Sequence, residues 1–154
     1  MAHTKDQIDE FLRNAFFSVL SFQGSDGLIS QLMIFGHSVD GSFYMISQNE
    51  KSIFDSLSAE SPVSALIYKE EENLDDITQL YLQGKATLIK DFSSADGQTA
   101  FQCIGEKSPL IAAAGGDPES PSKYSVVKVE ASVISYISFG EQKQSMPPTV
   151  LKRS

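Results

Sequence analysis

The chain has 154 residues with a formal net charge of −8, and 41% of its residues are hydrophobic against 21% charged. This length and composition predict one globular domain with a buried core and exclude a disordered chain. The acidic balance argues against a nucleic-acid partner, because proteins that bind the phosphate backbone carry a basic face. Runs of about 20 apolar residues are absent, so we expect no membrane partner.

The N-terminal residues and the cysteine content set the expected compartment. The first 14 residues contain acids and lack the apolar stretch of a signal peptide. Cys103 is the only cysteine, which excludes an internal disulfide and a multi-cysteine metal centre. We therefore expect a cytoplasmic protein without a metal site.

The first third of the chain predicts a helix followed by an antiparallel meander. Thr4 and Gln7 fit a capping box, and apolar residues at helical spacing extend the helix over residues 5–14. β-forming residues separated by two Asp-Gly turns then predict three strands in hairpin order. A change of period after the third strand predicts a second helix, which Pro62 ends. The strands are expected at 16–23, 28–37 and 42–48, and the helix at 49–59.

The remainder of the chain alternates strands with one further helix. Gly84 is expected to mark a bulge or bend in a long strand. Ser93 or Ser94 caps a helix that ends near Gly105. The acidic run at 70–76 is interpreted as a solvated loop in preference to a cation site. Strands are expected at 62–69, 77–90 and 124–139, and a loop at 106–123 with one helical turn at 109–113.

The order of these elements predicts the fold class. Consecutive strands joined by hairpins favour a small antiparallel barrel over a parallel sheet with crossover helices. We expect a domain over residues 1–140 and a tail over residues 141–154 that is mobile or lies along a partner.

Side-chain catalysis has little support in this sequence. A nucleophilic site would have to use His37 as its base, since the other histidine, His3, lies near the chain start. Cys103 lies beside apolar residues of the third helix and is interpreted as a small buried hydrophobe. The glycine-rich phosphate loops and the zinc-protease motif are absent. Catalytic residues therefore stay unassigned.

One segment has the character of a phosphate site. Residues 47–52 run from a strand end into a helix start, where backbone N–H groups favour an anion. Lys51 adds a full positive charge, and Ser47 and Ser52 add hydroxyl donors. The alternative is ordinary helix capping, because Ser47 and Glu50 also fit a capping box.

Three segments in this order carry a family resemblance. FYMISQNEKSIFDSL at 43–57, SPVSALIY at 61–68 and TQLYLQGKATLIKD at 78–91 resemble the pyridoxamine 5′-phosphate oxidase-like split-barrel family. Ser138-Phe139-Gly140 ends the last strand where the haem-utilisation (HugZ-type) branch has Gly-Phe-Gly, so the chain is similar to that branch without its extra C-terminal domain.

The resemblance implies a mainly β (α+β) fold, a six-stranded antiparallel split β-barrel with flanking short helices. It also implies a homodimer that holds flavin mononucleotide (FMN) in a cleft between the subunits. In the family, the second strand contacts the flavin, a pair at the helix start grips the phosphate, and a glutamine two strands on faces the isoalloxazine ring. Carried over by position, the cofactor-binding residues are Ser30, Gln31, Leu32, Met33, Ile46, Ser47, Lys51, Ser52 and Gln79.

The chain departs from the oxidase at the phosphate. Ser30 stands where the oxidase has an arginine, and Ser52 stands where it has a lysine. Each lost charge-assisted bond removes about 1.5–3 kcal/mol of binding free energy. The oxidase's C-terminal substrate motif has no counterpart, which argues against pyridoxamine phosphate as the substrate. Two hypotheses therefore stand: an FMN-dependent oxidoreductase of unknown substrate, and a non-catalytic dimeric split-barrel binding module that has lost tight flavin binding.

Overall fold

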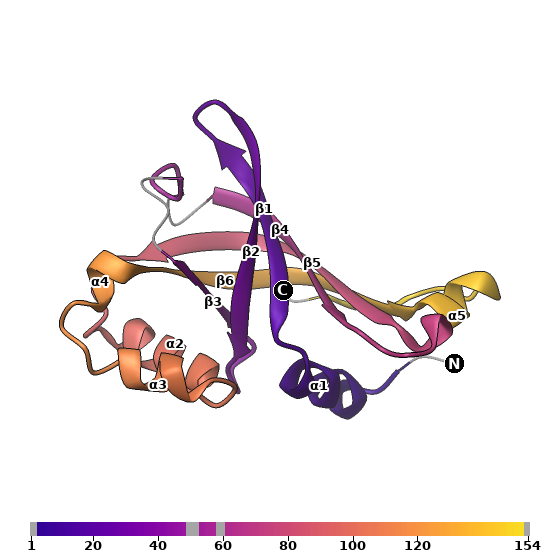
Figure 1. The fold of residues 1–154 in the computed structure, drawn as a ribbon. Helices are drawn as coiled ribbons and strands as arrows, with labels where there is room; N and C mark the ends of the chain where they lie inside the picture. Colours follow the sequence, from indigo (N-terminus) through magenta and orange to yellow (C-terminus); the bar gives the residue numbers. More distant parts are fainter. Residues whose placement is uncertain (1–2, 49–52, 58–60, 153–154) are drawn as a thin grey trace.

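The computed structural model describes residues 3–48, 53–57 and 61–152, and its centre is a seven-stranded antiparallel sheet (Figure 1). The strand order is β3-β2-β1-β4-β5-β6-β7, and β3 also pairs with β6, which closes the first six strands into a ring. The mainly β fold with short helices agrees with the expected split barrel. The strands are β1 Phe17–Gly24, β2 Gly27–His37, β3 Phe43–Gln48, β4 Ser61–Lys69, β5 Thr78–Ile89, β6 Tyr124–Ser138 and β7 Thr149–Lys152.

The helix α1 (Lys5–Asn14) begins with the predicted capping box. The Thr4 hydroxyl accepts a hydrogen bond from the Gln7 backbone N–H at 3.2 Å, and the Gln7 amide oxygen accepts one from the Thr4 N–H at 2.8 Å. The buried face of α1 presents Ile8, Phe11 and Leu12 to the same core that the strands line. The helix therefore covers one end of the ring of strands.

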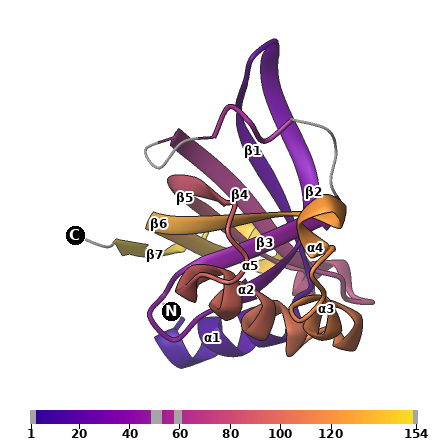
Figure 2. The same cartoon turned by 90° about the vertical axis from the view of Figure 1, so that its left-hand side faces the viewer.

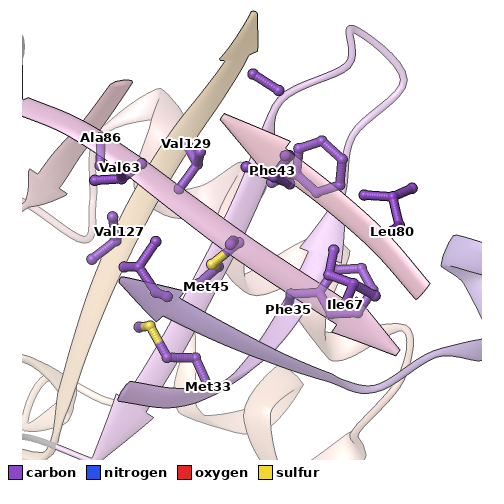
Figure 3. Packing of buried hydrophobic residues seen from close by; sticks show 14 of the residues in the cluster. Met33, Phe35, Phe43, Met45, Val63, Ile67, Leu80, Ala86, Val127 and Val129 are labelled. Carbon is purple, nitrogen blue, oxygen red and sulfur yellow. The ribbon is translucent and has the colours of Figure 1, made fainter. Parts of the chain in front are cut away.

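The core of the ring follows from strand alternation. Met33 and Phe35 of β2 point inward, and they meet Phe43 and Met45 of β3 and Leu80 of β5 (Figure 3). All five side chains are buried. Full burial of a large apolar side chain stabilises a protein by about 1.5–3 kcal/mol, so this core supplies much of the free energy of folding.

A second, smaller core lies between the outside of β3 and two helices, α2 (Ala95–Gly105) and α3 (Pro109–Ala114) (Figure 2). Ser94 caps α2, as predicted, by accepting a hydrogen bond from the Gly97 N–H at 3.1 Å. Tyr44 and Ile46 of β3 pack against Phe101 and Ile104 of α2. A further turn of helix, α4 (Ser120–Lys123), was not expected from the sequence.

A bulge in β6 sits opposite Gly84 and confirms the prediction for that glycine. Gln83 pairs with Val133 and Gly84 with Ala131, so Ser132 is the extra residue. A Cβ atom on Gly84 would lie 2.1 Å from the Glu130 carbonyl oxygen, which explains the requirement for glycine. The bulge changes the phase of β6, so that odd-numbered residues face the core before it and even-numbered residues face the core after it.

The expected second helix differs from the structure in its described part. Residues 53–57 of the expected second helix form a hydrogen-bonded turn, in which the Leu57 N–H bonds the Phe54 carbonyl at 3.0 Å; the rest of that helix lies outside the described residues. Phe54 and Leu57 are buried in the main core, and their packing holds the turn in place.

The C-terminal segment also differs from the expected mobile tail. It forms α5 (Phe139–Lys143) and β7, and β7 pairs with Val133–Tyr136 of the same chain.

In the loop expected at 70–76, Leu74–Asp76 form the 3-10 helix η1. Within the described ranges, no helix is long and apolar enough to cross a membrane.

Candidate functional site

The side of the sheet that faces away from the core forms one continuous surface over β2, β1, β4 and β5, which we call the outer face. The register aligns one residue of each strand into rows across this surface. The rows are polar at one side and apolar at the other. From the polar side they are Ser30-Ser21-Ser64-Gln83, Leu32-Val19-Leu66-Tyr81 and Ile34-Phe17-Tyr68-Gln79.

The two apolar rows of the outer face are unusually exposed. Leu32 is 53% exposed, Phe17 45% and Tyr81 41%, although each is paired with neighbouring strands in the sheet. Contiguous apolar side chains on the outside of a domain mark an interaction surface. This part of the outer face therefore has the character of a surface that a partner or a flat ligand covers.

The polar row offers hydroxyl and amide groups. The Ser21 and Ser30 hydroxyl oxygens lie 3.0 Å apart in a hydrogen bond, and both hydroxyl groups remain near solvent. The Gln83 amide donates to the Tyr81 phenol oxygen at 3.1 Å. Such groups hydrogen-bond a polar ligand edge without supplying charge.

Three of the residues that the resemblance singled out lie on the outer face. Ser30 and Leu32 are neighbours on β2, while Gln79 lies on β5. Two strands separate β2 from β5, so Gln79 is about 14 Å from β2 at a spacing of about 4.8 Å per strand. One chain alone does not bring Gln79 beside Ser30.

The side chains of the other described candidates are buried in a core or hydrogen-bond the chain's own backbone. Met33 is buried in the main core, and Ile46 is buried against α2 in the second core. Gln31 pairs with the inward residue Leu20, and its amide donates to the Leu32 carbonyl at 3.2 Å. The Ser47 hydroxyl donates to the Gln48 carbonyl at 3.1 Å. Lys51 and Ser52 lie outside the described residues.

A groove of about 620 Å³ lies between the β1–β2 turn and the turn at 53–57. The β1–β2 hairpin projects beyond the sheet, because β1 pairs with β4 only as far as Phe22 (Figure 1). Asp26 and Asp55 line the groove. The Ser56 hydroxyl donates a hydrogen bond to the Gln23 carbonyl at 3.1 Å, which joins the turn at 53–57 to β1. An anion in this groove needs a cation to offset the two carboxylates.

The titratable groups that the sequence considered for catalysis lie elsewhere. Burial lowers the pKa of His37, which lies on the inner side of β2. Burial raises the pKa of Cys103, so its thiol is a weaker nucleophile at neutral pH than an exposed one. Within the described part of the chain, no cluster of three or more His, Cys, Asp or Glu side chains is arranged to hold a metal.

Sequence reasoning missed the apolar rows. From the sequence, Phe17 and Val19 are interpreted only as part of a β-forming run. The signal was present in the alternation of β1, where Phe17 and Val19 are apolar although they alternate with the buried Ser18 and Leu20. A strand with apolar residues on both faces predicts cover on both faces.

Comparison with solved structures shows the same fold in proteins of low sequence identity. A protein related to general stress protein 26, of the pyridoxinephosphate oxidase family, from Clostridium acetobutylicum matches at 12% identity with a TM-score of 0.62, covering 96% of this chain and 92% of that one. HutZ, the heme storage protein of Vibrio cholerae, matches at 14% identity with a TM-score of 0.63, covering 85% of this chain and 91% of that one. A heme binding protein from Mycobacterium smegmatis matches at 10% identity with a TM-score of 0.69, covering 99% of this chain and 59% of that one.

These likenesses show that the chain has the split-barrel fold of pyridoxine phosphate oxidase-like proteins. No family model and no curated protein sequence matches it.

Proposed function

We propose that this split-barrel protein is a homodimer that holds FMN against its outer face and acts as an oxidoreductase. The observation that supports this proposal is the outer face itself. It joins an exposed apolar surface to a row of hydroxyl and amide groups, and it contains Ser30, Leu32 and Gln79.

We infer the dimer because the apolar side chains of the outer face have no cover in one chain. Leu32, Phe17 and Tyr81 expose apolar surface that a second copy would remove from water, at about 25 cal/mol per Å². A two-fold axis on this face sets β2 of one copy opposite β5 of the other, which brings Ser30 near the partner copy's Gln79. A flat ligand is then enclosed between two walls.

The described residues fit the ring of FMN better than its phosphate. Leu32 and Val19 offer an apolar wall, and Ser30 and Gln79 offer hydrogen bonds to the polar edge of a flavin ring. The flavin would supply the electron transfer that no described side chain provides. The protein's part is to bind and orient the ring and to exclude water from it. The family resemblance assigns the phosphate to Lys51, whose ammonium group would offset part of its charge.

The second candidate is a non-catalytic binding module on the same face. The hydrogen bond between the Ser21 and Ser30 hydroxyls favours it, because Ser30 is uncharged where, by the resemblance, the oxidase has an arginine. Proteins of the same fold are described as heme-binding, which shows that this architecture takes ligands other than flavins. In that case the phosphate of FMN contributes less to the binding affinity, and another planar ligand can compete with FMN for the apolar rows.

Titration with FMN tests the proposal. Added FMN is expected to lose fluorescence on binding, and Lys51→Ala is expected to weaken binding by about one to two decades, since one charge-assisted bond is lost. Lys143→Ala is the matched control. Lys143 is exposed and away from the outer face, and its ammonium nitrogen lies 3.0 Å from the Asp75 carboxylate. Absence of binding to FMN together with binding of haem at the same face would leave the binding module as the function.

A further inference from the structure

We propose that the end of the barrel under α1 is a second ligand site, specific for a small neutral aromatic compound with one hydroxyl or ring N–H group. The pocket lies between α1, the β2–β3 turn, the bulge of β6 and β7, and its volume is about 210 Å³. Its lining shares no residue with the outer face. The inference is therefore independent of FMN binding.

The floor of the pocket is apolar. Ile8 and Leu12 of α1 and Ala131 of β6 are buried there. Ile134 of β6 and Leu151 of β7 stand side by side in the register and form a second wall. An engineered cavity of about 150 Å³ with similar lining holds benzene, so this pocket has room for one ring and a substituent.

The charged groups at the rim are already engaged. The Lys5 ammonium bonds the Asp9 carboxylate at 2.6 Å. Asp40 accepts hydrogen bonds from the Ser38 hydroxyl and from the Ser42 N–H, and these bonds lower the pKa of Asp40 to about 2. A charged ligand would have to compete with these interactions, whereas a neutral ligand would not.

His37 supplies the polar group that the pocket offers to a ligand. Its ring contacts Phe43 at a centroid distance of 4.8 Å, and no residue among 3–48, 53–57 and 61–152 hydrogen-bonds its nitrogens. Burial lowers the pKa of His37 below its ordinary 6.5, with Lys5 and Lys107 acting in the same direction and Asp9 and Asp40 opposing it, which favours the neutral imidazole above pH 6.5. A neutral imidazole has one nitrogen that accepts a hydrogen bond and one that donates.

These properties select the ligand class. An aromatic ring satisfies the apolar floor, and its hydroxyl or N–H donates to the accepting nitrogen of His37. An anion finds no uncommitted cation among the lining residues, since Lys5 is already paired with Asp9. Phenol and toluene are therefore the matched probes, since they have similar shape and differ in the hydroxyl group.

The experiment is an NMR titration of the full chain with phenol and with toluene. We expect both to shift amide signals of the lining residues, with phenol bound about tenfold more tightly. His37→Phe should remove that advantage and leave toluene within about threefold, because one hydrogen bond is worth about a factor of ten. His37→Gln keeps a hydrogen-bonding side chain and should retain part of the preference.

A neighbouring pair on β7 supplies the control. Leu151→Ser should weaken both probes, because Leu151 lines the pocket. Val150→Ser should change neither, since Val150 pairs with Ser135 on the opposite side of the strand. The proposal is overturned if neither probe shifts the lining signals, if His37→Phe leaves the preference for phenol intact, or if both β7 variants act alike.

Discussion

The ammonium nitrogen of Lys107 lies 3.5 Å from the centroid of the Phe35 ring, inside the molecule. The same nitrogen donates to the backbone carbonyls of Leu12 at 2.8 Å and Ala15 at 2.7 Å. Ala15 follows the last turn of α1, so one lysine far along the chain satisfies carbonyl groups that the helix end leaves open. Lys107 thereby fastens α1 to the end of the barrel.

Lys107 gives the protein a pH dependence at the alkaline side. Burial lowers the pKa of Lys107 to about 8, against 10.5 in the unfolded chain. Between these values the unfolded state binds the proton and the folded state does not, so this group makes the free energy of unfolding rise with pH. The rise is at most about 1.4 kcal/mol per pH unit. Urea unfolding of the wild type at pH 7, 8, 9 and 10 measures it.

Two matched variants test whether this pH dependence of stability comes from Lys107 or from lysines in general. Lys107→Met should lack this rise and should be less stable throughout, because two carbonyls lose their donor. Lys143→Met should keep the wild-type pH dependence, since Lys143 is an exposed residue in a surface ion pair. Equal pH profiles for Lys107→Met and the wild type would show that the folded pKa of Lys107 is not lowered.

The apolar rows of the outer face predict the effect of a charge on assembly. Leu32→Glu places a carboxylate in the middle of the surface that the proposed dimer buries, so the variant should be a monomer of 16.8 kDa by light scattering where the wild type has twice that mass. Flavin affinity should fall with it. Leu110→Glu, an equal change at an exposed residue of α3, should leave the dimer intact. A monomeric wild type would refute the dimer outright.

Elements with strong local signals were predictable from the sequence. The capping box at Thr4, the Asp-Gly turns and the glycine at 84 all act through neighbouring backbone, and the structure confirms each of them. The ordered segments that carried the resemblance also predicted the split-barrel fold. Local chemistry was enough in these places because the partner atoms lie within a few residues or on the next strand.

Elements that depend on distant partners were missed. Val150 and Leu151 form a strand only because β6 offers a free edge beyond the point where β3 leaves it. The turn at 53–57 has helical spacing, but Phe54 and Leu57 are fixed by the core. The outer rows likewise depend on the register of four strands, although the alternation of β1 already indicates an apolar outer side.

The candidate site was predictable only in part for the same reason. The resemblance placed Ser30, Leu32 and Gln79, and these three share the outer face. It also singled out Met33 and Ile46, whose side chains are buried in two different cores. Alternation in β2 already separates residues 30 and 32 from 31 and 33, but the family positions were carried over as a contiguous run.

His37 predicts a loss of stability in mild acid. Burial lowers the pKa of His37 below its ordinary 6.5, so the unfolded chain binds a proton that the folded chain does not as the pH falls below about 6.5. The contribution of a neutral His37 to stability is present above that pH and decreases below it. His37→Phe should therefore lose less stability than the wild type between pH 7.5 and pH 5.5, as measured by thermal unfolding. A larger acid loss in the variant would contradict this origin.

A methyl group added at Gly84 should lower the free energy of unfolding, because the backbone of β6 leaves no room for it. An alanine Cβ there would lie 2.1 Å from the Glu130 carbonyl oxygen and 2.8 Å from the Ala131 Cα, and both atoms belong to the backbone of β6. The strand has to move, so Gly84→Ala should cost about 1–3 kcal/mol of unfolding free energy. Ala131 also lines the pocket under α1, so the same variant should change the binding of the aromatic probes. At Gly116 an added Cβ would lie 3.9 Å from the Ala113 oxygen, so Gly116→Ala should unfold like the wild type. Equal stability of both variants would show that β6 accommodates the methyl group.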